Sequence, residues 1–174
     1  MSVESGLHAG EIDCLVSRLV IGVRWIGVFA RDELPDVTRK KRPWCLILNT
    51  DLKDIPGTHW LAIYAPQSGR IELFDLFVFS PSMFGLVSLD PLHLFYSLQS
   101  PSFSVCEHYC IVYIYLRSRH TSQNQIFHLP LNISNRDLWV TNYIHNLKTH
   151  LCILNFCNHT GQCCQLKCQF CWTK

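Results

Sequence analysis

The pattern of apolar and turn-forming residues predicts three consecutive strands in the first half of the chain. The apolar runs are residues 44–48 (WCLIL), 59–64 (HWLAIY) and 70–74 (RIELF). A stretch rich in Asn, Asp, Pro and Gly separates the first two runs, and a Pro-Gln-Ser-Gly turn separates the last two. Strands joined by short turns pair antiparallel, so the pattern predicts a mostly antiparallel central sheet.

The second half of the chain has helical patterns. From residue 106 onward nearly every position of a helix-length segment is apolar, which is typical of a central, buried helix. Residues 134–148 instead have a single apolar face, and Ser134 with Asp137 resembles a capping box. That face consists of Val140, Tyr143, Ile144 and Leu147. Together with the strands, these segments predict an α+β fold.

Three weaker segments complete the prediction. Residues 8–20 have a loosely amphipathic pattern that indicates a short helix. Residues 19–29 are rich in Val, Ile, Trp and Phe and are expected to include a strand. Residues 77–92 have no clear period, and we expect a loop with a short helix packed over the sheet.

Composition narrows the class of protein. A chain of 174 residues with 48% apolar and 16% charged residues fits one globular domain, expected over residues 1–150. The tail, residues 151–174, contains six of the ten cysteines and is expected to be loosely ordered. A net charge of +2 gives no argument for a dedicated nucleic-acid protein. The longest apolar stretch is too short for a membrane span, and no secretory signal is visible, so we expect an intracellular protein with reduced cysteines.

Candidate chemistry begins at Cys106, which the pattern places in the first turn of the buried helix. Unpaired N–H groups and partial positive charge at a helix start favour a thiolate there, so we expect a lowered thiol pKa. Seven residues upstream, the amide of Gln99 is placed to donate to an oxyanion. The competing interpretation is structural, because a cysteine on an apolar helix is usually a small buried hydrophobe.

The predicted hairpin supplies a histidine and a carboxylate. His59 opens one strand and Asp75 follows the end of its partner, so the two are expected to be adjacent in space. Glu72 is the competing carboxylate, and His93 and His108 are the competing bases. His108 is a poor partner for the thiol because it lies two residues further along the same helix.

The cysteine-rich tail is the second candidate site. Cys168 and Cys171 form a C-x-x-C pair with further Cys and His nearby, and these are ligand types for zinc. A second paired element is missing. We therefore expect no metal and no cofactor, and a reduced, loosely ordered tail.

Several motifs, taken in order, resemble the adenovirus-type cysteine protease. The resemblance is greatest to the version encoded by Maverick/Polinton virus-like transposons and related viruses, and it spans roughly residues 27–147. Its motifs are GVFARDELP at residues 27–35, Asn49-Thr50-Asp51, Pro56-Gly57-Thr58-His59-Trp60, Phe74-Asp75, Leu98-Gln99-Ser100, Val105-Cys106 and His108-Tyr109-Cys110.

This resemblance implies a cysteine-protease fold of the adenain/SUMO-protease type, whose buried helix carries the nucleophile. It implies that Cys106 attacks a peptide carbonyl, His59 is its base, Asp75 orients the imidazole, and Gln99 holds the oxyanion. The expected function is a cysteine endopeptidase that matures viral or transposon capsid precursors. The family also implies a protein or peptide substrate and, in the adenovirus enzyme, activation by a peptide and DNA.

Two departures from the family keep alternatives open. Glu107 follows the nucleophile where the family usually has glycine, and a carboxylate there would raise the thiol pKa. Residues 76–79 (LFVF) stand where the family tends to have a small polar residue and a glycine. The alternatives are a ubiquitin-like-protein isopeptidase and a catalytically inactive binding module that keeps the protease fold.

Overall fold

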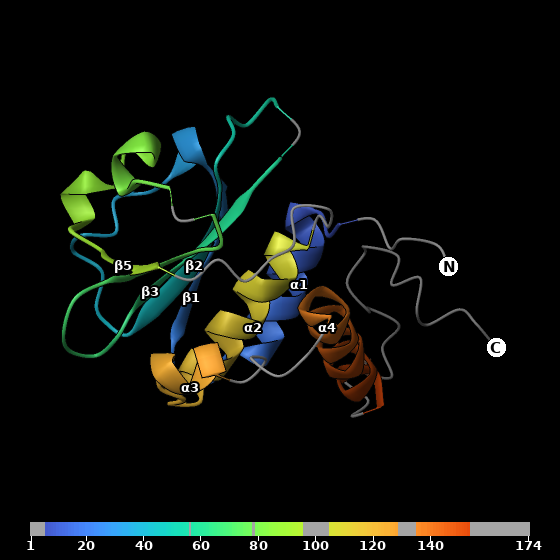
Figure 1. Ribbon diagram of the computed structural model, residues 1–174. Coiled ribbons are helices and arrows are strands. Elements are labelled where there is room, and N and C mark those ends of the chain that lie inside the picture. Colours follow the sequence, from blue (N-terminus) through green and yellow to red (C-terminus); the bar gives the residue numbers. More distant parts are fainter. Residues whose placement is uncertain (1–5, 56, 78, 96–104, 129–134, 154–174) are drawn as a thin grey trace, which may run out of the picture.

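A five-stranded sheet forms the centre of the computed structural model, which describes residues 6–55, 57–77, 79–95, 105–128 and 135–153. The strands lie side by side in chain order (Figure 1). They are β1 (Arg24–Ala30), β2 (Trp44–Asn49), β3 (Trp60–Ala65), β4 (Glu72–Asp75) and β5 (Leu92–Phe95). The three strands predicted from the apolar runs are confirmed as β2, β3 and β4.

The sheet is mixed, which corrects the prediction of a mostly antiparallel one. Strands β2, β3 and β4 pair antiparallel as expected. The outer strands β1 and β5 run parallel to their neighbours. Residues 31–43 and 76–91 connect these parallel pairs, and such long connections let the chain cross over instead of turning back. Strand β5 was not predicted at all.

Helices and short turns cover the two faces of the sheet separately. On one face lie α1 (Ala9–Leu19), α2 (Cys106–Ser118) and α4 (Arg136–Ile153), with α3 (Gln123–His128) after α2 (Figure 1). The 3₁₀ turns are η1 (Arg31–Glu33), η2 (Pro81–Phe84) and η3 (Val87–Leu89). The sheet separates two hydrophobic cores. Phe84 and Leu86, from the η2–η3 region, pack with Leu61 and Leu73 in the smaller one, which we call the second core. The expected short helical segment over the sheet is therefore present.

Helix α2 is the centre of the larger core. Every residue from Cys106 to Ile114 is buried, which confirms the prediction of a buried helix. Glu72 of β4 accepts hydrogen bonds from the Tyr113 hydroxyl (2.6 Å) and from Nε (2.9 Å) and Nη2 (2.7 Å) of Arg117. The rings of Phe74 and Tyr113 stack with centroids 4.5 Å apart. These contacts fix the orientation of α2 on the sheet and so the position of its first residue.

Helix α4 has the predicted apolar face but a different cap. Val140 and Ile144 are buried. The Asn135 side chain accepts the backbone N–H of Leu138 at 2.9 Å, so Asn135 is the capping residue. Asp137 accepts the Tyr109 hydroxyl at 2.9 Å, and Ser134 lies outside the described residues. The Ser134–Asp137 box therefore stays a prediction.

The weaker predictions at the start of the chain are also confirmed. Helix α1 buries Ile12, Leu15, Val16 and Leu19. The strand expected within residues 19–29 is β1, which begins at Arg24. Its pairing with β2 shifts register near Gly27, whose φ of 135° is a conformation that favours glycine.

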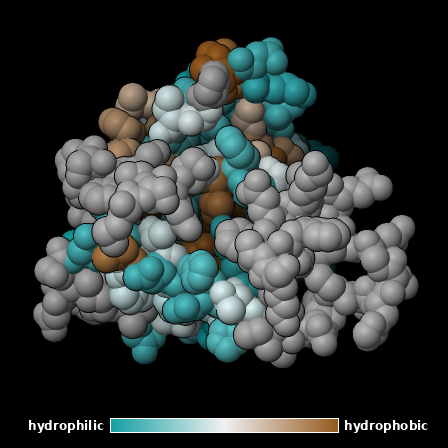
Figure 2. All heavy atoms as spheres, turned by 90° about the vertical axis from the view of Figure 1, so that its right-hand side faces the viewer, coloured by the Kyte–Doolittle hydropathy of each residue, from teal (hydrophilic) through white to brown (hydrophobic). Residues whose placement is uncertain are grey.

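The surface gives two further observations. Within the described residues, no helix combines the length and apolarity needed to cross a bilayer. On the face turned to the viewer in Figure 2, a small hydrophobic area near the centre has described hydrophilic residues above and below it.

Candidate functional site

His59 and Asp75 form a buried hydrogen-bonded pair at one end of the central hairpin. His59 directly precedes β3, and Asp75 is the last residue of β4. His59 Nε2 lies 2.7 Å from Asp75 Oδ1, and the two residues are only 6% and 1% exposed. The adjacency expected from the hairpin is therefore present, and it follows from strand pairing alone.

The Asp75 carboxylate is satisfied on both oxygens. Oδ1 also accepts the backbone N–H of Phe77 at 2.9 Å, and Oδ2 accepts that of Phe79 at 2.7 Å. Burial alone would raise the pKa of Asp75, but the hydrogen bonds from His59, Phe77 and Phe79 outweigh burial and lower it. The carboxylate is thus held ionised and oriented toward the imidazole.

The loop after β2 fixes the backbone around His59. Thr50 donates its backbone N–H to the His59 carbonyl at 3.0 Å. Asp51 Oδ2 accepts both the backbone N–H and the hydroxyl of Thr58 at 2.7 Å. A Cβ on Gly57 would lie only 1.8 Å from the side-chain nitrogen of Asn49, so glycine permits this close approach. These contacts give a structural role to the Asn-Thr-Asp and Pro-Gly-Thr-His motifs.

The second nitrogen of His59 has no hydrogen-bond partner. Nδ1 is the one buried side-chain N or O atom in the described part of the chain that lacks one. Buried polar atoms are nearly always paired, so an orphan of this kind needs an explanation. The Phe77 ring lies against the imidazole, with centroids 4.6 Å apart.

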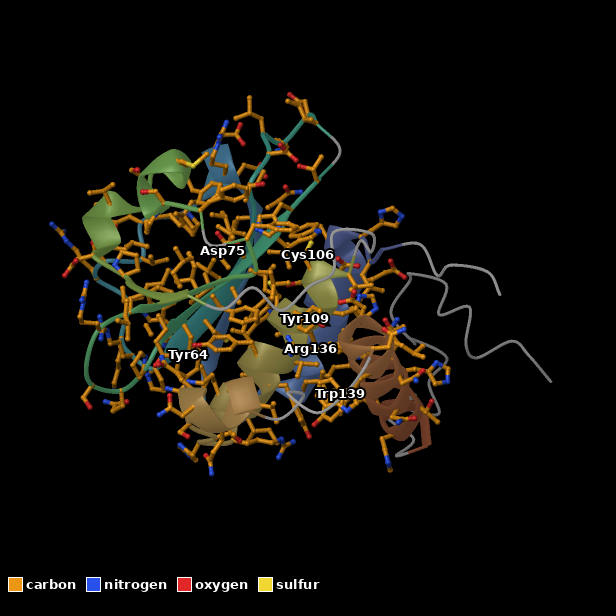
Figure 3. All side chains as sticks on the ribbon, viewed as in Figure 1. Tyr64, Asp75, Cys106, Tyr109, Arg136 and Trp139 are labelled. Carbon is orange, nitrogen blue, oxygen red and sulfur yellow. The ribbon has the colours of Figure 1, made fainter. Side chains whose placement is uncertain are left out.

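Cys106 is the first residue of α2, as predicted. A hydrogen bond with the Trp60 backbone connects the thiol to the residue that follows His59. The thiol also donates to Glu107 Oε2 at 3.6 Å. Figure 3 shows Cys106 at the start of α2, at the same end of the molecule as Asp75.

The expectation of a lowered thiol pKa is wrong. Burial and the negative charge of Glu107 raise the pKa of Cys106 to about 12, and the hydrogen bond with Trp60 opposes them only in part. The residue is 3% exposed, so burial outweighs the partial charge of the helix start. At neutral pH the resting form is a neutral thiol that donates to Glu107.

Glu107 is a fixed buried anion. Its Oε1 accepts the backbone N–H of Leu7 at 2.9 Å and pairs with His108 Nδ1 at 3.1 Å. Burial acts to raise the pKa of Glu107, but the contacts with His108 and Leu7 outweigh it and lower the pKa. The carboxylate therefore stays charged beside the sulfur. This agrees with the expectation that a carboxylate directly after Cys106 raises the thiol pKa.

Replacing Glu107 by glutamine is expected to make Cys106 more reactive. Removing a charge at this distance should raise the thiolate fraction at pH 8 by about tenfold or more. The measurement is the rate of Cys106 alkylation by iodoacetamide between pH 6 and pH 11, followed by mass spectrometry. The parent profile should still be rising at pH 11, and the Glu107→Gln profile should lie at lower pH. Glu33→Gln, on an exposed carboxylate, is the control, and coincident profiles for Glu107→Gln and parent would contradict the role of the charge.

The other candidates have different partners or positions. Gln99 lies outside the described residues, as do the cysteines of residues 154–174. Glu72 pairs with Arg117, His108 pairs with Glu107, and Cys110 donates to the Trp60 carbonyl at 3.4 Å. The strand that contains His93 is described but its side chain is not. The described residues contain no cluster of three potential metal ligands.

Two contacts at the site were not predicted. The Trp60 backbone lies against the thiol, and the N–H of Leu7 reaches Glu107 across one hundred positions of sequence. The first could have been found from strand order, because Trp60 follows the candidate histidine. The second has no local signal. A comparison with the models of known protein families found none that matches this chain.

Proposed function

We propose that this chain is a cysteine endopeptidase of the adenovirus-protease type, and that it matures viral or transposon precursor proteins. The observation that carries the proposal is the placement of Cys106. Its thiol, at the start of a buried helix, contacts the backbone of the residue next to His59, while Asp75 holds His59 by Nε2 and Nδ1 is left without a hydrogen-bond partner. This arrangement supports a site in which Cys106, His59 and Asp75 act together.

The raised pKa of Cys106 determines how the reaction would begin. Because the resting thiol is neutral, its proton passes to His59 Nδ1 as the sulfur attacks the substrate carbonyl carbon. His59, then protonated and stabilised by Asp75, gives that proton to the leaving amine as the C–N bond breaks. Water hydrolyses the resulting thioester. The backbone N–H at the start of α2, with Gln99, would hold the oxyanion.

A second candidate function is supported by Glu107. A charged carboxylate 3.6 Å from the thiol opposes formation of the thiolate. This favours a binding module that keeps the protease fold without turnover. The two candidate functions differ in the rate of peptide hydrolysis, which can be measured.

The test is hydrolysis of a peptide mixture by the purified full chain and by Cys106→Ala. Mass spectrometry of new peptide ends measures the rate. The proposal predicts cleavage by the parent chain and none above background by Cys106→Ala. Cys110→Ala, on the same buried helix, is the control and should retain cleavage. Equal rates in parent and Cys106→Ala would reject the peptidase and leave the binding module. Covalent capture of Cys106 by an electrophilic ubiquitin-like probe would favour the isopeptidase alternative.

A further inference from the structure

The Asp75 carboxylate fixes two phenylalanines beside His59. Its Oδ1 holds the backbone N–H of Phe77 and its Oδ2 that of Phe79. Phe77 and Phe79, which we call the aromatic pair, are therefore positioned by the same group that orients the candidate base. Any displacement of the aromatic pair would therefore disturb Asp75, and with it the position of His59. The aromatic pair belongs to the region in which the sequence departs from the family.

The rings of the aromatic pair form one apolar surface against the imidazole. The Phe77 centroid lies 4.6 Å from that of His59, and the Phe79 ring meets His59 edge-on at 6.1 Å. The two phenylalanine centroids are 5.9 Å apart. Phe79 also contacts Phe84 at 6.3 Å, and Phe84 is buried, which anchors the pair to the second core. These are ordinary separations for interacting aromatic rings.

This surface remains open to solvent. Phe77 is 42% exposed and Phe79 is 41% exposed. Isolated exposed apolar residues are common, but adjacent rings fixed by a buried carboxylate beside a candidate catalytic base are not scattered surface residues. The nearest carboxylate, Asp75, is only 1% exposed, so it adds no charge to the open surface. The chemistry of the surface suits an apolar side chain.

The unpaired nitrogen of His59, Nδ1, identifies which substrate residue would reach the aromatic pair. Asp75 occupies Nε2, so Nδ1 is the atom that passes the proton to the leaving amine. That amine must come within hydrogen-bond distance, about 3 Å, of Nδ1. The residue that carries the amine is the one immediately after the scissile bond. Its side chain then lies within reach of the Phe77 ring, which contacts the same imidazole.

We propose that the aromatic pair is a subsite for an aromatic or branched aliphatic side chain on the residue immediately after the scissile bond. This inference rests on the proposed peptidase function and names its substrate class. Contact of such a side chain with two rings should favour it over glycine by about tenfold to hundredfold in kcat/KM. The subsite would select on the leaving-group side of the bond.

The experiment is a cleavage profile on a proteome-derived peptide mixture, followed by kinetics on matched pairs. In each pair the residue after the cleaved bond is Leu in one peptide and Gly in the other. The parent chain should produce new amino ends enriched in Phe, Leu and Ile, and it should prefer the Leu peptide. Phe77→Ala should reduce the Leu/Gly ratio of kcat/KM about tenfold, and Phe77→Leu should restore part of it.

The control is Met83→Ala, which removes an exposed apolar side chain of η2 and should leave the ratio unchanged. Phe79→Ala is a second variant in case Phe77→Ala does not fold, and it should also lower the ratio. Cys106-dependent cleavage with no preference after the bond would overturn the subsite and leave the peptidase standing. Absence of any Cys106-dependent cleavage would overturn the peptidase and the subsite with it.

Discussion

Replacing Asp75 by asparagine is expected to lower kcat/KM for peptide hydrolysis by about a thousandfold. The carboxylate accepts from His59 Nε2 at 2.7 Å, which fixes the orientation of the imidazole. An amide has one acceptor oxygen where the carboxylate has two, so it cannot hold His59, Phe77 and Phe79 together. It also removes the charge that stabilises protonated His59.

The measurement is steady-state hydrolysis of one cleaved peptide by parent, Asp75→Asn and Asp90→Asn. Asp90 is the matched control because it is an exposed carboxylate paired with Arg70 on the surface, and its replacement should leave the rate unchanged. Circular dichroism would verify that both variants fold. A loss of less than about tenfold in folded Asp75→Asn would contradict the orienting role.

Asp75 should also affect stability in acid. Its pKa is lowered in the folded chain, so its contribution is present above the ordinary carboxyl pKa of about 4 and is lost as the pH falls toward the folded value. The free energy of unfolding of the parent should therefore decline below about pH 4. Asp75→Asn should show a smaller decline over the same pH range.

Replacing Arg117 by methionine is expected to lower the free energy of unfolding by about 3–5 kcal/mol. Arg117 donates two hydrogen bonds to Glu72, and Glu72 is only 5% exposed. Removing the guanidinium leaves a buried carboxylate without its counter-charge. The remaining Tyr113 hydroxyl cannot neutralise that charge.

Urea unfolding at pH 7 measures this effect, with Arg119→Met as the control. Arg119 is an exposed arginine of the same helix end and stacks on Tyr115, so its replacement should change stability little. The double variant Glu72→Gln/Arg117→Met should recover part of the loss, because it removes the stranded charge. A single Arg117→Met variant as stable as the parent would show that the pair does not hold α2 on the sheet.

The parts of the site that could be predicted are those set by local pattern. A hairpin connects His59 and Asp75 across only 16 positions, so strand limits and a short turn were enough to place them together. The start of α2 at Cys106 follows from a polar stretch of sequence that precedes an apolar helical pattern. Both inferences need only neighbouring residues.

What could not be predicted depends on distant contacts. The thiol pKa is set by burial and by Glu107, whose charge is stabilised by His108 and by the N–H of Leu7, which precedes α1. No local pattern shows which backbone N–H will reach a carboxylate one hundred positions away. Strand β5 was missed for a similar reason, because its pairing with β4 follows a long crossover connection.

The aromatic pair illustrates the same limit. In the sequence, residues 76–79 only mark a departure from a resembling family. In the folded chain, the Phe77 ring covers His59 and its N–H completes the Asp75 carboxylate. Residues 76–79 look in the sequence like the loss of a family motif, but Phe77 has a defined position beside His59 in the folded chain.

The central claim is that Cys106 and His59 react as one pair, and labelling by a peptide vinyl sulfone tests it most directly. The thiol adds across the vinyl group, and mass spectrometry locates the modified cysteine. The account predicts labelling of the folded parent at Cys106, and at a rate at least about a hundredfold lower in His59→Ala. Equal rates in the two proteins, or labelling of Cys14 while Cys106 stays unmodified, would contradict it.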